Sequence, residues 1–210
     1  MKIKRFKFLV FLTGLITLIF ILSGCMNSTS PIINPNPQVR DTIWIWQPGQ
    51  YGIAQGVSPW AICVDPQTDM IYVVNYDSNN VSVINGQTNS VVQTISVGNN
   101  PWGVGVDPQT DMIYVANWGD NTVSVINGQT NSVVQTISVG SGPEAVGVDL
   151  QTDMIYVANQ GDSTVSVING QTNTVVQTIS VGNKPDAVGV DLQTDMIYVA
   201  NWGDNTVSVI

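Results

Sequence analysis

A repeat of 42 residues is the feature that most constrains how this 210-residue chain can fold. The repeat begins at Pro59 and runs without insertion, so that a proline returns at Pro101, Pro143 and Pro185. Only ten positions differ between residues 59–100 and residues 101–142. A period in the forties is typical of solenoids and propellers, because each unit forms one small element that buries its apolar face against the next unit.

The content of one unit decides between these architectures. Each unit contains four short segments rich in Val, Ile, Tyr and Thr, separated by clusters of Gly, Asn, Asp and Pro. No segment shows the spacing of an amphipathic helix, which excludes helical repeats. We therefore predict an all-β chain, a β-propeller built from four-stranded antiparallel blades. In the second unit the expected strands are residues 102–106, 112–117, 122–126 and 132–139, with a turn at Asn127-Gly128.

The number of blades follows from the extent of the array. The units are residues 59–100, 101–142, 143–184 and an incomplete 185–210, so we expect about four blades. Either residues 50–56 or residues 42–46 could add the outer strand that the last unit lacks. A free arc of four blades would expose two apolar faces, so we expect the array to be part of a larger propeller, a closed ring or a self-associated assembly.

One motif within the unit resembles a known family. Residues 113–126 (IYVANWGDNTVSVI), together with Val106-Asp-Pro before them and Gln135 to Gly140 after them, are similar to the signature of the YVTN-family β-propeller repeat. The resemblance covers the whole array and recurs in each unit. It implies an extracytoplasmic or surface protein, usually with about seven blades. It does not imply one activity.

The start of the chain has the features of a targeting sequence. Four basic residues before position 8 precede an apolar run over residues 8–22, and Leu22-Ser-Gly-Cys25 resembles the lipobox of bacterial lipoproteins. We predict a signal peptide over residues 1–24 and a lipid on Cys25 that holds the protein to a membrane, in the periplasm or at the cell surface. An ordinary secretory signal or an uncleaved anchor is the alternative. Residues 25–41 form a Pro-, Asn- and Ser-rich tether, followed by the repeats in residues 42–210.

Composition excludes several classes of function. All 15 acidic residues lie after Cys25, against only two basic ones there, Arg40 and Lys184, so we expect no nucleic-acid partner. The chain has no His, which removes Ser-His-Asp and Cys-His catalysis and His-ligated zinc or haem. We therefore expect no catalytic residues, no cofactor and no metal site. Cys63 stands where the later units have Gly, and we expect it to be a small buried side chain.

The recurring aspartates do not form a calcium loop. Asp65 and Asp69 lie four residues apart across a turn, and Asp120, Asp162 and Asp204 each follow a Gly. None of them matches the Asp-x-Asp-x-Asp-Gly pattern. Because Asp and Asn side chains accept hydrogen bonds from nearby turn N–H groups, we expect these residues to cap turns.

The candidate ligand site lies on one rim. In a propeller the loops from each fourth strand to the next first strand, and from each second to each third strand, share an edge, which we call the top rim. Most differences between the first two units fall in or beside these loops. The rim positions after the prolines and at the second-to-third turns carry Trp60, Trp102, Glu144, Asp186, Tyr76, Trp118, Gln160 and Trp202. These side chains either bind a sugar or peptide, or pack as caps between neighbouring blades.

The function that we expect from the sequence is binding. A lipid-anchored module at the cell envelope would use the top rim to hold a protein or carbohydrate. The alternative is a propeller enzyme of the lactonase or quinoprotein dehydrogenase type. Fold does not decide between these functions. Stoichiometric bound metal would favour the enzyme.

Overall fold

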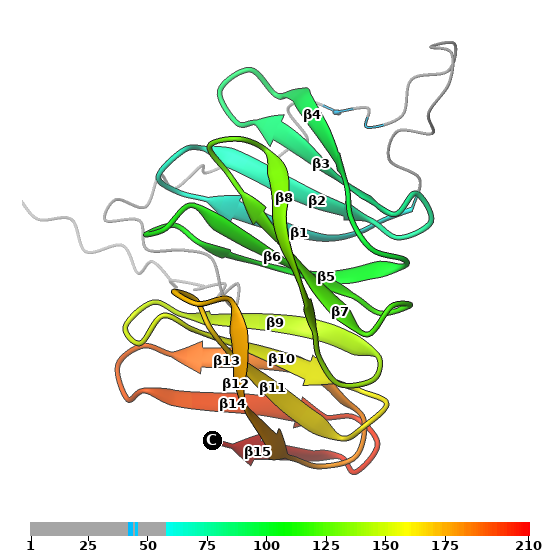
Figure 1. Ribbon diagram of the computed structural model, residues 1–210, viewed down its shortest axis with the longest axis vertical. Helices are drawn as coiled ribbons and strands as arrows, with labels where there is room; N and C mark the ends of the chain where they lie inside the picture. The colour runs from blue at the N-terminus through cyan, green and yellow to red at the C-terminus, as the bar shows by residue number, and fades with distance from the viewer. Residues whose placement is uncertain (1–41, 44, 46–57) are drawn as a thin grey trace, which may run out of the picture.

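In the computed structural model, which describes Thr42, Ile43, Ile45 and residues 58–210, every regular element is a β-strand (Figure 1). This confirms the predicted all-β fold. The strands are β1 (Pro59–Asp65), β2 (Met70–Asn75), β3 (Asn80–Asn85), β4 (Ser90–Ser96), β5 (Pro101–Asp107), β6 (Met112–Asn117), β7 (Thr122–Asn127), β8 (Ser132–Ser138), β9 (Pro143–Asp149), β10 (Met154–Asn159), β11 (Thr164–Asn169), β12 (Thr174–Ser180), β13 (Pro185–Asp191), β14 (Met196–Asn201) and β15 (Thr206–Val209).

The strands form four antiparallel sheets, one for each repeat. Three sheets have four strands in chain order, and the last sheet contains β13, β14 and β15. These sheets are the predicted blades, and we number them one to four. Each strand of the second blade starts and ends within one residue of its expected bounds. Alternating β-branched residues and closely spaced turn residues therefore determine the blade locally.

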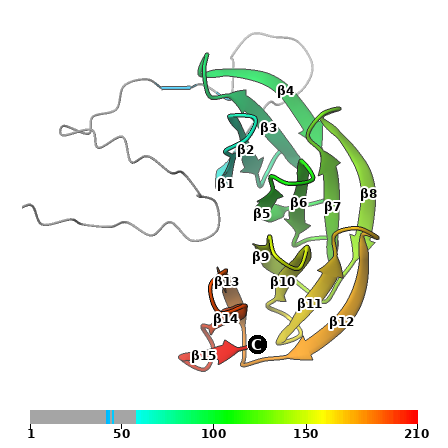
Figure 2. The same ribbon diagram turned by 90° about the vertical axis from the view of Figure 1, so that its left-hand side faces the viewer.

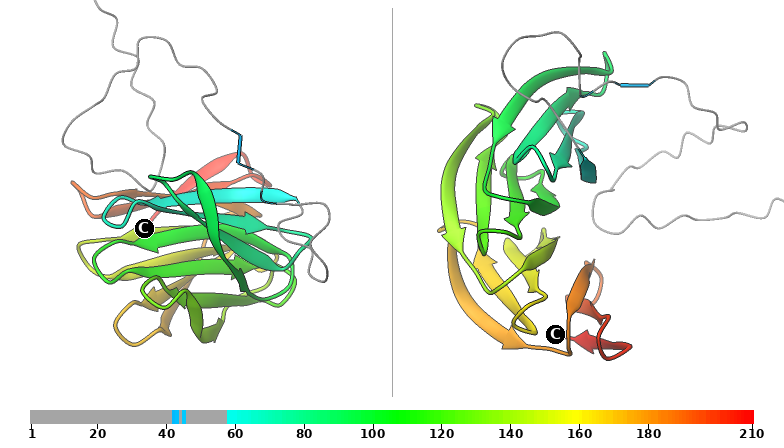
Figure 3. Two further views of the ribbon diagram at one scale, coloured as in Figure 1. Left: turned by 90° about the horizontal axis from the view of Figure 1, so that it is seen from above. Right: turned by 90° about the vertical axis from the view of Figure 1, so that its right-hand side faces the viewer.

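The blades stack face to face along an arc. The first strands β1, β5, β9 and β13 are neighbours on its inner side, and the outer strands β4, β8 and β12 follow its convex side (Figure 2). The opposite view shows the same order, with the first and last blades at the two ends of the arc (Figure 3). The first strands thus line the inner side of the arc.

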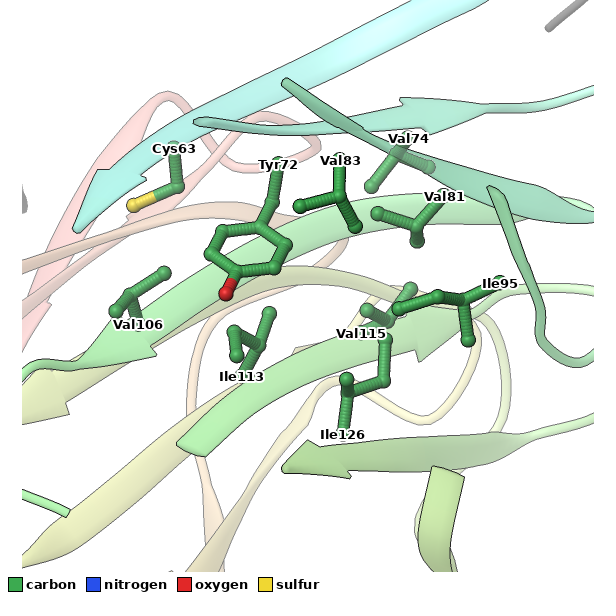
Figure 4. Close-up of a cluster of buried hydrophobic side chains, with 10 residues drawn as sticks. All are labelled: Cys63, Tyr72, Val74, Val81, Val83, Ile95, Val106, Ile113, Val115 and Ile126. Atoms are coloured by element: carbon green, nitrogen blue, oxygen red, sulfur yellow. The ribbon is translucent and has the colours of Figure 1, made fainter. Parts of the chain in front are cut away.

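The hydrophobic core lies between blades. The first cluster joins Tyr72 and Val83 of the first blade to Ile113 and Val115 of the second (Figure 4). Similar clusters join the second blade to the third and the third blade to the fourth. Cys63 is buried in the first cluster, as the sequence predicts. Because each apolar face is covered by the next blade, stability is shared between neighbouring repeats.

Aspartates hold the turns that join first and second strands. In each turn the carboxylate at the end of the first strand accepts the N–H group two residues later and the Thr hydroxyl three residues later. Capping of these turns by Asp side chains is the role that the sequence predicts. The four aspartates are Asp65, Asp107, Asp149 and Asp191.

The Asn127-Gly128 turn differs from a two-residue hairpin. The residue with positive φ is Asn131 (48°), while Oδ1 of Asn127 accepts from the backbone N–H of Thr130 at 3.0 Å. Gly128 is required for another reason, since a Cβ at this position would collide with the carboxylate of Asp111. The turn lies where the sequence predicts it, but glycine fits there because the Asp111 carboxylate lies close to its Cα.

Several sequence-based expectations lie outside the described residues. They include the signal peptide over residues 1–24, the lipid site at Cys25, the tether and the candidate strand over residues 50–56. Within residues 42–46, the described Thr42, Ile43 and Ile45 are not part of a strand. In the described part of the chain no helix is long and apolar enough to cross a membrane.

Candidate functional site

The top rim is assembled by pairs of loops. In each blade the loop before the first strand accepts a backbone hydrogen bond from the residue that follows the second strand. These bonds are 2.9–3.1 Å long, and they bring the two predicted sets of rim positions to the same edge. The donors are the N–H groups of Tyr76, Trp118, Gln160 and Trp202, and the acceptors are the carbonyls of Ser58, Asn100, Gly142 and Lys184.

In each blade a β-bulge carries the rim residue that follows the proline. The pairing of each first strand with its second strand shifts register after the proline, so that one residue is left without a partner. A bulge of this kind re-aims the side chain that it carries. The residue just before the bulge is a proline in every blade. Proline has no N–H to donate to the ladder, so it is well tolerated at this irregular position. The four unpaired residues are Trp60, Trp102, Glu144 and Asp186.

Three aromatic rings meet at the rim of the first two blades. The ring centroids of Trp60 and Trp102 are 4.5 Å apart, and Tyr76 lies 5.5 Å from Trp102 in an edge-to-face arrangement. The Trp60 and Tyr76 centroids are 6.0 Å apart. These separations are typical of favourable aromatic pairs. Trp60 remains 56% exposed, so the cluster is both packed and open to solvent.

The other two rim tryptophans occupy different surroundings. Trp118 lies against the loop that enters the third blade, because a Cβ added to Gly142 would be 3.1 Å from its Nε1 atom. Trp202 is 64% exposed, and Nζ of Lys184 lies 4.8 Å from its ring centroid. That distance is short enough for a cation–π interaction.

The third blade replaces the aromatics with a buried acid. Glu144 is only 6% exposed, and its Oε1 accepts a hydrogen bond of 2.6 Å from Nε2 of Gln160. Burial, followed by the charge of Asp186 in the next blade, raises the pKa of the Glu144 carboxyl, while the Gln160 hydrogen bond lowers it. The sequence predicts Glu144 as a ligand-binding residue of the rim; in the structure its side chain is buried and hydrogen-bonded to Gln160.

The aspartates of the rim loops hold the backbone. Asp120 accepts hydrogen bonds from the N–H of Asn99 at 2.6 Å and from its side-chain amide at 2.8 Å. Asp162 and Asp204 accept the corresponding N–H groups of Ser141 and Asn183. The sequence predicts that these aspartates cap their own turns, whereas in the structure each accepts from the neighbouring rim loop, 21 residues away in the chain. Across the part of the chain that is described, no three metal-ligating side chains gather in one place.

A buried amide network beneath the rim was not anticipated. The last residue of β6, Asn117, is fully buried and donates from Nδ2 to Oγ1 of Thr122 and Oγ of Ser124. The same arrangement recurs in every blade, at Asn75, Asn159 and Asn201. The sequence does contain a signal for this network. In every unit the Asn at the end of the second strand is followed by Thr or Asn five residues later and by Ser seven residues later.

Carboxyl groups also meet between blades at the opposite edge. Burial, then the charge of Asp65 and a hydrogen bond with it, raise the pKa of Asp111. Asp153 stands in the same relation to Asp107 of the preceding blade. These pairs lie in the first-to-second turns, away from the rim aromatics. They are structural contacts between consecutive repeats.

Comparison with known proteins bears on the fold. No protein-family model matches the chain, and no curated protein is significantly similar to it. Among solved structures, hydrazine synthase of Kuenenia stuttgartiensis is similar, with a TM-score of 0.70 and 20% sequence identity. The fold is that of a β-propeller. The match covers 79% of this chain and 49% of that one, so the chain spans about half the length of its structural neighbour.

Proposed function

We propose that the chain is a lipid-anchored extracytoplasmic β-propeller of the YVTN type, and that its top rim binds a protein or carbohydrate at the cell envelope. The observation that carries the proposal is the cluster of Trp60, Tyr76 and Trp102. Three touching rings remain partly open to solvent on one edge of the molecule. Aromatic anchors of this kind supply much of the free energy of many binding interfaces.

The charges around the rim narrow the choice of ligand. Five aspartates lie in or beside the rim loops, and Lys184 is the only basic residue between positions 58 and 210. Such a surface repels anions and favours a neutral or cationic partner. A neutral sugar stacking on the rings, or a peptide with basic residues beside an aromatic anchor, fits this description. The aspartates are Asp77, Asp120, Asp162, Asp186 and Asp204.

The proposed location rests on the start of the chain. A basic segment, an apolar run of about fifteen residues and the Leu22–Cys25 box occur in the order expected for a lipoprotein precursor. The Pro-rich residues 26–40 would then hold the blades away from the membrane. A short anchor followed by an extended tether suits a module that meets ligands outside the cytoplasm.

The rim is tested by locating a ligand and then removing single rings. A glycan array and capture from envelope extract, both with the full chain, identify the ligand class. Trp60→Ala and Trp102→Ala should each weaken binding by about 1–3 kcal/mol, as aromatic anchors do. Gln67→Ala, exposed at the opposite edge, is the matched control. Normal binding by both tryptophan variants would exclude the rim as the binding face.

A second candidate function follows from Glu144. A buried carboxyl with a raised pKa beside Asp186 has the character of a general acid or base. A propeller hydrolase of the lactonase type would use it. Lactone hydrolysis that falls in Glu144→Gln, with stoichiometric metal in the purified protein, would favour the enzyme over the binding module.

A further inference from the structure

The rim loops of the second and fourth blades can be compared directly, because their sequences are almost the same. Residues 116–126 and residues 200–210, which contain the second-to-third turns, are identical. The loops that enter these two blades, residues 97–100 and residues 181–184, differ only at their last position. That position is Asn100 in the second blade and Lys184 in the fourth.

The backbone around this single difference is also the same. The N–H of Trp118 donates to the carbonyl of Asn100 at 3.1 Å, and the N–H of Trp202 donates to the carbonyl of Lys184 at 3.0 Å. Asn100 and Lys184 both have a left-handed backbone, with φ values of 48° and 52°. A side chain at position 100 therefore starts from the same backbone position, relative to its tryptophan, as the side chain of Lys184 does.

The tryptophan of the fourth blade carries a cation, and that of the second does not. Nζ of Lys184 lies 4.8 Å from the ring centroid of Trp202, where the electrons of the ring face attract positive charge. Lys184 is the only basic side chain among the residues that the structure describes, so none of them offers a cation to Trp118. Asn100 is short and neutral, and Trp118 is 40% exposed. The second blade thus has the ring of this contact without its cation.

Negative charge lies on the same turn as this ring. Asp120 follows Trp118 by two residues and is exposed. Its carboxylate accepts hydrogen bonds from the backbone N–H and the side-chain amide of Asn99, and both donors are neutral. The charge of Asp120 is therefore not cancelled by these partners. A carboxylate and an exposed aromatic ring on one turn favour an ammonium or guanidinium group over a neutral or anionic one.

We propose that the Trp118 turn receives a lysine or arginine side chain of a partner peptide, which lies over the ring as Lys184 lies over Trp202. This inference rests on the proposed binding role of the top rim, and it names the class of partner as a basic peptide. Lys184 then occupies in the fourth blade the position that the partner's cation takes in the second. A neutral sugar would gain nothing from the charge of Asp120.

The experiment supplies the cation from within the chain. Asn100→Lys keeps the ring of Trp118, and the backbone at this position already accepts lysine in the fourth blade. The probe is a peptide of three Gly-Lys repeats with blocked ends, titrated calorimetrically into the full chain in mild detergent. The proposal requires that this peptide binds, that a peptide of three Gly-Gln repeats does not, and that Asn100→Lys weakens binding by about 2- to 30-fold.

A charge-matched variant separates the proposed contact from the net charge of the protein. Gln129→Lys adds the same charge at an exposed position in the turn after β7, on the opposite edge, and should weaken binding less. Equal affinities of the two variants for the Gly-Lys peptide would overturn the proposal, because net charge would then explain the binding. Far-UV circular dichroism checks that both variants are folded.

Other results distinguish this inference from the proposed function. Suppose that the unmodified chain does not bind the Gly-Lys peptide, but binds a neutral glycan whose affinity falls in Trp102→Ala. The top rim would then be a binding face for sugars, and the assignment of a basic peptide would be wrong. If neither the glycan nor the peptide is affected by any rim variant, the rim is not a binding face and both proposals fail.

Discussion

The side-chain amide of Asn117 donates a hydrogen bond of 2.9 Å to Oγ of Ser124, and both residues are buried beneath the top rim. The bond ties the end of β6 to β7 at the point where the chain turns through the rim. A Cβ added to Gly98, in the loop from the preceding blade, would lie 2.6 Å from Cγ of Asn117. This asparagine therefore links two strands of its own blade and supports the loop that enters it.

Replacing Asn117 with Ala should destabilise the protein. The Thr122 and Ser124 hydroxyls would lose their buried donor, and an unsatisfied buried polar group costs about 1–3 kcal/mol. Urea unfolding followed by tryptophan fluorescence measures the change. Gln129→Ala, exposed in the turn after β7, is the control. Equal midpoints for the two variants would refute a structural role for the amide.

The contact between Gly147 and Val188 should behave as a coupled pair. Gly147→Ala places a Cβ 2.6 Å from Cγ1 of Val188, and overpacking of this kind typically costs about 1–3 kcal/mol. Val188→Ala removes the obstructing methyl groups. The double variant should therefore be more stable than the sum of the two single changes predicts, by about 0.5–3 kcal/mol. Strict additivity of the free energies of unfolding would show that the two side chains do not compete for the same space.

The carboxyl pair at Asp153 should make stability depend on pH. Burial, and then the charge of Asp107, raise the folded-state pKa of Asp153 above its ordinary value. Its stabilising contribution is therefore complete below the ordinary pKa and is lost as the pH rises through the folded-state value. Asp153→Asn should raise the free energy of unfolding at pH 7, and the gain should shrink as the pH falls towards 4.

A matched variant separates this contact from the loss of one charge. Asp69 holds the same turn position in the first blade and has nearly the same φ, 59° against 56° for Asp153. Asparagine tolerates this left-handed conformation, so neither backbone is strained by the change. In the described residues no blade precedes Asp69, so Asp69→Asn should show a smaller effect. Equal pH profiles for both variants would show that net charge alone is responsible.

The predicted signal peptide and lipid site can be tested separately. If Cys25 carries the lipid, Cys25→Ala should leave the membrane fraction or accumulate as unprocessed precursor, because the acyl chains supply the anchoring free energy. Gln67→Ala should fractionate as the unmodified protein does, since Gln67 is exposed in the turn after β1. Mass spectrometry of the N-terminal peptide checks the lipid directly. Unchanged fractionation of Cys25→Ala with no lipid mass would rule out the lipoprotein assignment.

The blade was predictable because its information is local. The alternation of Val123, Ser124 and Val125 defines one apolar face, and the clusters of turn residues define where each strand stops. The top rim followed from the order of strands alone. The sequence also predicted that Asp120 would accept a backbone hydrogen bond, but the donor is Asn99 of the neighbouring rim loop and not a residue of its own turn.

The features that escaped prediction depend on contacts between segments that are separated in the sequence. Glu144 is buried and accepts a hydrogen bond from Gln160, and burial, followed by the charge of Asp186 in the next repeat, raises its pKa. Glycine is favoured at position 128 because a Cβ there would collide with the Asp111 carboxylate, not because of the two-residue turn that the sequence suggests. Whether the rim tryptophans pack or bind could not be separated by sequence either, because Trp102 contacts its neighbours while Trp60 stays largely exposed.

The contacts of Gly105 with Val146 and of Gly147 with Val188 are equivalent, so one repeat can take the place of another at these junctions. A gene that gained or lost one 42-residue unit by unequal recombination would encode a chain whose new junction meets the same contacts as the old one. Copy number in such an array is therefore free to drift without the redesign of any interface. Near-identical units also allow the wrong neighbours to pair during folding, and the first unit is distinguished at these positions by Ile62 and Cys63, where the later units have Val and Gly.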